Sequence, residues 1–154
     1  MQVTEEELHQ IHDMVYKSYV AGIVDGEGYI GISLSGLAPQ PQVIVVQKNQ
    51  QAFLEELCGR WGGTVYLNKT AGGVHQWGLY KKEDIFKFLR DITPYLRFKR
   101  RRAELLSKFC ELPNLRSAEN ASELLLVRDS LVEEFEALKS LEGWGKQKEV
   151  QSCQ

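Results

Sequence analysis

The 154 residues have the length of one domain and carry a formal net charge of -2. No apolar run approaches the roughly 18 residues of a membrane-spanning helix, and three widely spaced cysteines exclude a disulfide-rich or zinc-binding class. The acidic start, Glu5 to Glu7, has no signal-peptide core, so we expect an intracellular protein of the cytoplasm or an organelle, without a membrane partner.

Charge is unevenly distributed along the chain. Residues 29–102 hold twelve Lys or Arg against five Asp or Glu, whereas residues 117–142 hold seven acids against two bases. Neutralising phosphates depends on a local surface rather than on the sum over the chain. The middle of the chain therefore remains a candidate nucleic-acid-binding region.

The first predicted element is a helix that begins at Thr4 and Glu7, which form a capping-box pattern, and reaches Asp25. Its apolar positions predict a buried helix and are Val15, Tyr16, Tyr19, Val20, Ile23 and Val24. Its small residues fall four apart and share one face: Ser18, Gly22 and Gly26. A second helix can approach such a face backbone to backbone.

Two acids stand where this helix ends. Asp25 and Glu27 are separated by Gly26, and Gly28 is a helix stop signal. The pattern predicts carboxylates held at the mouth of a tight helix pair.

The remaining elements alternate between strand and helix spacing. Strands are predicted over 29–34, 42–48, 64–68 and 74–80, with helices over 50–61, 82–89, 99–112 and 122–141, the last as one helix or two. The order predicts an α+β domain over 1–142, in which two hairpins form one antiparallel sheet backed by helices. A flexible polar tail is expected over 143–154.

Residues 20–28 resemble the signature motif of the LAGLIDADG homing endonucleases. Ala21, Gly22, Asp25 and Gly28 match it, and Glu27 stands for its last acid. The element order also agrees with this family, to about Leu141. The resemblance implies a sequence-specific endonuclease that cuts double-stranded DNA across the minor groove, leaves 3′ overhangs and promotes intron mobility.

The motif occurs once, and in this family a single motif implies a homodimer that acts on a long, pseudo-palindromic site. The small face needs an equally flat partner, and its own copy across a two-fold axis is the simplest one. The residues expected at this dimer interface are Ser18, Gly22, Gly26 and Asp25.

Pairing two motif helices brings two Glu27 carboxylates together. Close carboxylates repel, and Mg2+ or another divalent cation relieves this in all-oxygen sites. By resemblance, Glu27 is the metal ligand and a catalytic residue, and Asp25 is mainly structural.

The resemblance adds Gln47 as a water-organising catalytic residue and Lys99 as a catalytic cation. The alternatives are an ordinary polar residue at a strand end for Gln47 and a solvated member of a basic run for Lys99. The chain departs from the family at Gln51, where a basic residue is expected, and Lys48 could compensate.

Strand alternation predicts one sheet face toward the core and one toward DNA. The inward residues are expected to be Ile30, Ile32, Val43, Val45, Val65, Leu67, Trp77 and Leu79. The DNA-binding residues are expected to be Tyr29, Gly31, Ser33, Ser35, Gln40, Gln42, Ile44, Lys48, Tyr66, Asn68, Lys69, Gln76 and Gly78. Gln and Asn suit adenine in the major groove, and lysines suit phosphate. The alternative is a plain solvated sheet face.

Other functions remain open from the sequence. An RNA-splicing maturase, or a DNA-binding regulator without cleavage, could use the same scaffold with RNA or DNA as partner. An unrelated α+β binding module is the third possibility.

Overall fold

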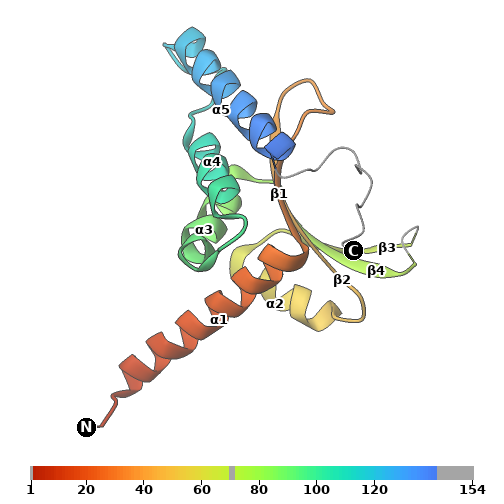
Figure 1. Ribbon diagram of the computed structural model, residues 1–154, viewed down its shortest axis with the longest axis vertical. Coiled ribbons are helices and arrows are strands. Elements are labelled where there is room, and N and C mark those ends of the chain that lie inside the picture. Colours follow the sequence, from red (N-terminus) through yellow and green to blue (C-terminus); the bar gives the residue numbers. More distant parts are fainter. Residues whose placement is uncertain (1, 70–71, 142–154) are drawn as a thin grey trace, which may run out of the picture. The chain divides into compact units, whose positions relative to one another are not determined.

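A computed structural model of the protein describes residues 2–69 and 72–141 (Figure 1). The expected polar tail over 143–154 lies outside the described residues. The helices are α1 (Glu5–Glu27), α2 (Gln51–Trp61), α3 (Lys82–Ile92), α4 (Arg100–Glu111) and α5 (Ala121–Leu141), with a short 3-10 helix over Thr93–Tyr95. The strands are β1 (Gly28–Ser33), β2 (Gln40–Gln47), β3 (Thr64–Asn68) and β4 (Val74–Leu79). The chain divides into two compact units, one ending at Glu111 and the other beginning at Leu112.

Helix α1 begins with the predicted capping box. The N–H of Glu7 donates to the Thr4 hydroxyl at 3.2 Å, and the N–H of Thr4 donates to the Glu7 carboxylate at 2.8 Å. These bonds satisfy donors that have no partner within the helix. The helix runs on to Glu27, two residues beyond the predicted end.

Gly28 ends α1 for a spatial reason. Its φ of -82° is open to any residue, but a Cβ atom there would lie 2.7 Å from the Cα atom of Val24. Strand β1 therefore leaves the helix through a space that only glycine fits, which places Glu27 at the junction of helix and sheet.

The strands form one antiparallel sheet in the order β1-β2-β4-β3. The predicted hairpins, β1–β2 and β3–β4, are joined by pairing of β2 with β4. Helices α1 to α4 lie on one side of this sheet (Figure 1). The predicted α+β class with an antiparallel sheet is confirmed.

The core lies between the helices and the inward sheet face. Six of the eight predicted inward residues are buried: Ile30, Ile32, Val43, Val45, Trp77 and Leu79. Trp61 and Trp77 both contact Phe88 edge to face, with ring centroids 5.0 and 5.1 Å apart. The prediction was wrong for Leu67, which is 45% exposed, and Val65 is only half-buried, because both lie on the edge strand β3.

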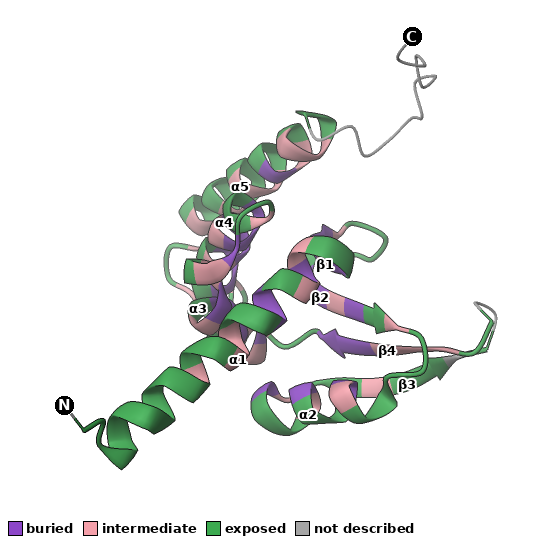
Figure 2. Cartoon of the chain, turned by 60° about the horizontal axis from the view of Figure 1, so that its bottom comes forward, coloured by how far each residue is buried: buried purple, intermediate pink, exposed green. Residues whose placement is uncertain are grey.

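Two α1 residues that were expected in the core are exposed. Val15 is 63% and Tyr19 is 61% exposed, whereas Val20 and Val24 are fully buried. Figure 2 shows that the N-terminal half of α1 is mostly exposed and that its C-terminal part carries the buried residues. The apolar residues of α1 thus lie on two faces of the helix, and the single chain buries only one of these faces.

The second unit contains α5, which is one continuous helix. Lys139 forms an ion pair with Glu136 at 2.9 Å, one turn earlier. Over 2–69 and 72–141, no helix has the length and apolar character needed to cross a membrane.

Candidate functional site

Glu27 and Gln47 meet at the end of the motif helix. Glu27 is the last residue of α1 and Gln47 the last of β2. The Nε2 atom of Gln47 donates a hydrogen bond to the Oε2 atom of Glu27, across 20 residues of sequence. Gln47 alternates with the buried Val45 and Val43, so its side chain points to the helix side of the sheet. The structure therefore brings together two of the three predicted catalytic residues.

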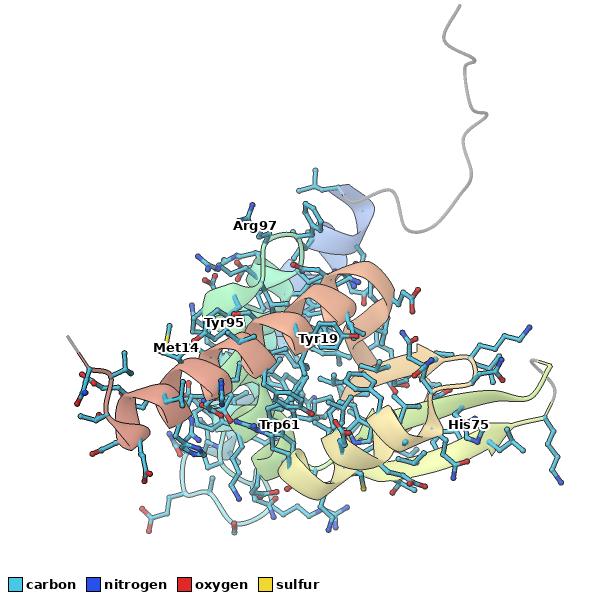
Figure 3. All side chains as sticks on the ribbon, turned by 90° about the horizontal axis from the view of Figure 1, so that it is seen from below. Met14, Tyr19, Trp61, His75, Tyr95 and Arg97 are labelled. Atoms are coloured by element: carbon cyan, nitrogen blue, oxygen red, sulfur yellow. The ribbon has the colours of Figure 1, made fainter. Side chains whose placement is uncertain are left out.

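The Asp25 carboxylate binds the loop before α4. Its two oxygens accept the backbone N–H groups of Arg97, Phe98 and Lys99 at 2.8, 3.2 and 3.0 Å. Arg97 is labelled in Figure 3. A carboxylate is stabilised at the N-terminal end of a helix by the partial positive charge there. Asp25 thus acts structurally within its own chain, and its predicted place at a dimer interface stays a prediction.

Lys99 binds the other side of the same junction. Its Nζ atom donates to the carbonyl oxygens of Val24 at 2.7 Å, Asp25 at 2.9 Å and Gly28 at 2.7 Å. A cation suits the last turn of a helix, where carbonyls lack partners. The alternative of a solvated lysine is wrong, because its ammonium is anchored to the backbone on both sides of Glu27.

Gln51, where the chain departs from the family pattern, makes a contact within its own helix. Its Nε2 atom donates to Glu55 at 2.8 Å, one turn further along α2. Lys48, the proposed substitute, directly follows Gln47 and is exposed.

The sequence analysis did not name His75 as a neighbour of the candidate site. It is the cross-strand partner of Gln47. It lies on β4 and is labelled in Figure 3. Within the described part of the chain, its Nδ1 atom is buried without a hydrogen-bond partner. The alternation that turns Trp77 inward also turns His75 inward, so the strand pattern could have placed it beside Gln47.

The predicted DNA-binding residues of the strands share one face. Register pairs Tyr29 with Ile44, Ile44 with Gly78, and Gln76 with Tyr66, and paired residues point to the same side of a sheet. By the same pairing, Gly31, Ser33, Gln40, Gln42 and the backbone position of Asn68 belong to this face. Ser35 follows in the loop, bonded to Ser33 at 2.9 Å, and exposed Lys69 follows β3.

Two glycines of this face are covered by tyrosines. A Cβ atom at Gly31 would lie 2.2 Å from the Tyr29 hydroxyl, and one at Gly78 would lie 2.5 Å from the Tyr80 hydroxyl. Both glycines are buried, so the surface that was expected from them is provided by tyrosine rings. Tyr80, the last residue of the predicted strand 74–80, is an exposed residue that was not among the predicted DNA-binding residues.

The predicted small face of α1 is open in the single chain. Ser18, Gly22 and Gly26 are exposed, and nothing lies within 4 Å of a Cβ atom built at either glycine. The Ser18 hydroxyl folds back onto the carbonyl of Met14 at 2.7 Å, which keeps the face flat. Val15 extends the same exposed face one turn earlier.

Within 2–69 and 72–141, no group of three or more His, Cys, Asp or Glu side chains is placed to hold an ion. Glu27 is an exposed carboxylate at the site, with Gln47 as its neighbour.

The sequence and the fold were compared with those of known proteins. No protein-family model matches the sequence. Among solved structures, the homing endonuclease I-CvuI in complex with its DNA target and Ca is 22% identical, with a TM-score of 0.73 over 91% of this chain and 89% of that chain. The archaeal intron-encoded homing endonuclease I-Vdi141I, in complex with DNA, is 14% identical, with a TM-score of 0.66 over 90% and 89%.

A longer protein shares the same fold. The LAGLIDADG meganuclease I-AabMI, bound to uncleaved DNA, is 18% identical, with a TM-score of 0.61, and the match covers 90% of this chain but 53% of that chain. The protein thus has the fold of the LAGLIDADG homing endonucleases, and the resemblance seen in the motif is confirmed in the fold.

Proposed function

We propose that this protein is a site-specific endonuclease that cuts double-stranded DNA. The observation that carries the proposal is the contact between Glu27 and Gln47, at the end of a helix whose sequence resembles the LAGLIDADG motif. Its support is the shared fold, since solved proteins with this fold are named homing endonucleases and are seen with DNA.

The acting form is a homodimer in this proposal. The support is the open face of Ser18, Gly22 and Gly26, where no side chain holds a neighbouring helix away. This chain matches about half of the I-AabMI chain, so two copies would equal the longer protein. A two-fold dimer would face a long, pseudo-palindromic DNA site.

The residues at the site fit Mg2+ or another divalent cation. Such hard cations take oxygen ligands, and Glu27 offers an exposed carboxylate on each of two paired chains. The fit needs both copies, because one chain supplies one such acid. When bound there, the cation would supply Lewis-acid stabilisation of phosphate charge and activation of water.

The chain's own residues position this carboxylate. Gln47 holds one oxygen of Glu27 through its amide nitrogen, which leaves its amide oxygen to orient a water molecule. Lys99 fixes the carbonyls on either side of Glu27, and Asp25 fixes the loop that carries Lys99. Hydrolysis needs groups held in advance where charge develops, and this network holds them.

DNA would lie on the sheet face opposite the helices. Its polar side chains, such as Gln42 and Gln76, suit base edges in the major groove, and Lys48 and Lys69 suit the phosphates. By the same resemblance, cleavage occurs across the minor groove, leaves 3′ overhangs and promotes mobility of the intron encoding the protein, in the cytoplasm or an organelle.

The test is incubation of the full chain with a randomised DNA duplex library and Mg2+, followed by sequencing of bound and cut molecules. We expect one pseudo-palindromic sequence to be cut in both strands. Selective binding without cutting would instead favour the DNA-binding regulator, and selective binding of RNA would favour the maturase. The absence of any nucleic-acid selection would contradict the proposal.

A further inference from the structure

Three side chains on the exposed sheet face form one hydrogen-bonded cluster. The hydroxyl oxygens of Tyr66 and Tyr80 lie 3.0 Å apart. The Nε2 atom of Gln76 donates to the Tyr66 hydroxyl. Tyr66 and Gln76 are also directly opposite each other on β3 and β4. The cluster therefore joins the edge strand to its neighbour through side chains as well as backbone.

Tyr80 reaches this cluster because Gly78 has no side chain. A Cβ atom at Gly78 would lie 2.5 Å from the Tyr80 hydroxyl and 2.7 Å from its ring. The tyrosine ring thus lies back along β4 over Gly78 and points its hydroxyl toward Tyr66. Burial, and then the bond to Tyr66, raise the pKa of Tyr80 to about 12.

This arrangement determines how Gln76 can meet a ligand. A glutamine amide has two N–H donors and one oxygen acceptor. The bond to Tyr66 uses one N–H, so the second N–H and the amide oxygen are the groups that Gln76 can offer to a ligand. Adenine presents the complementary pair in the major groove, an N7 acceptor beside an N6 donor. A glutamine held in this orientation before binding loses less rotamer freedom on contact with the base.

We propose that Tyr80 is a specificity-determining positioning residue, which with Tyr66 holds the Gln76 amide to read one adenine in each half-site. This inference rests on the proposed DNA-binding function and adds which base is read and what fixes the reader. Tyr80 acts here through Gln76 and need not touch the base.

The first test compares base preferences of wild-type protein and Gln76→Ala on a selected target, with all four bases placed in turn at each position. Adenine should be preferred at one position in each half-site, and Gln76→Ala should lose that preference, by roughly 5- to 150-fold for one bidentate contact. If Gln76→Ala loses a preference for a base other than adenine, or loses no preference at all, the assignment to adenine is overturned.

The second test isolates Tyr80. Tyr80→Phe keeps the ring over Gly78 and removes only the hydroxyl, and it should weaken the same adenine preference by about 2- to 10-fold, the cost of ordering one flexible side chain on binding. Tyr66→Phe should weaken the preference at the same position. Tyr29→Phe is the matched control, because Tyr29 covers Gly31 in the same manner, and it should leave this position unchanged.

These outcomes separate the inference from the function beneath it. A uniform loss of affinity at all positions in Tyr80→Phe would make Tyr80 merely structural, and an unchanged profile would remove it from recognition. Either result overturns the inference while selective cutting by the wild-type protein stands. If the wild-type protein selects no DNA sequence, the proposed function itself fails.

Discussion

Asp25 and Lys99 bind each other's backbone. The N–H of Lys99 donates to the Asp25 carboxylate at 3.0 Å, and the Lys99 ammonium donates to the Asp25 carbonyl oxygen at 2.9 Å. The pair joins the C-terminal end of α1 to the N-terminal end of α4 and places a suitable charge at each helix end. Because Glu27 follows Asp25 by two residues, the position of the proposed catalytic carboxylate depends on this pair.

Removing the Lys99 ammonium should therefore destabilise the fold. In Lys99→Met, three carbonyl oxygens around the end of α1 lose a charged donor, and hydrogen bonds to charged groups are worth about 1.5–3 kcal/mol each. We expect the free energy of unfolding to fall by at least the value of one such bond, about 1.5–3 kcal/mol. Urea denaturation followed by circular dichroism measures this change. Lys87→Met, at an exposed position of α3, is the control and should change stability by less than about 0.5 kcal/mol. Equal effects of the two variants would show that the contacts of the Lys99 ammonium contribute nothing to stability.

The small face of α1 predicts a specific loss of the dimer. A Cβ atom at Gly22 meets nothing within 4 Å in the single chain and the position is exposed, so Gly22→Leu should fold normally and separate the paired helices. Gly59→Leu is the matched control, since Gly59 is also an exposed helical glycine with nothing within 4 Å. Analytical ultracentrifugation should find a Gly22→Leu monomer and a Gly59→Leu dimer. A wild-type monomer that still cuts both DNA strands would contradict the pairing.

Tyr80 predicts a change of stability at high pH. Burial, and then the bond to Tyr66, raise its pKa in the folded state from 10.0 to about 12. The folded state holds this proton more tightly than the unfolded state, so the contribution to stability is complete below pH 10 and is lost as the pH rises toward 12. Ultraviolet titration of tyrosinate should show one late step that is missing in Tyr80→Phe. Identical titrations of the two proteins would disprove the raised pKa.

Local patterns in the sequence predicted the elements well. Thr4 and Glu7 are three residues apart and define the helix start by themselves, and strand alternation placed Gln76 and Tyr66 on the same sheet face. Such features depend on neighbours along the chain. The exposure of Val15 could not be predicted in this way. An apolar stripe on a helix does not reveal whether it packs against its own chain or against another.

The candidate site depended on contacts between distant residues. Glu27 and Gln47 were paired only through the family resemblance, and no spacing rule joins residues 20 apart on a helix and a strand. The anchoring of Lys99 was not predicted, since a basic run reads as a solvated surface until the backbone places carbonyls around it. Tyr80 was missed although alternation along the predicted strand 74–80 puts it on the same face as Gln76 and Gly78. Alternation does not predict that its ring lies over Gly78.

The most direct test of the proposed nuclease is Glu27→Gln. This change keeps the side-chain volume and removes the charge, so the dimer and its affinity for DNA, measured by gel shift, should survive the loss of two mutually repelling carboxylates. Mg2+-dependent cutting of the same target should fall by several orders of magnitude, because the proposed divalent cation would lose its carboxylate ligand. Cleavage by Glu27→Gln at close to the wild-type rate would place the active site elsewhere and contradict the proposal.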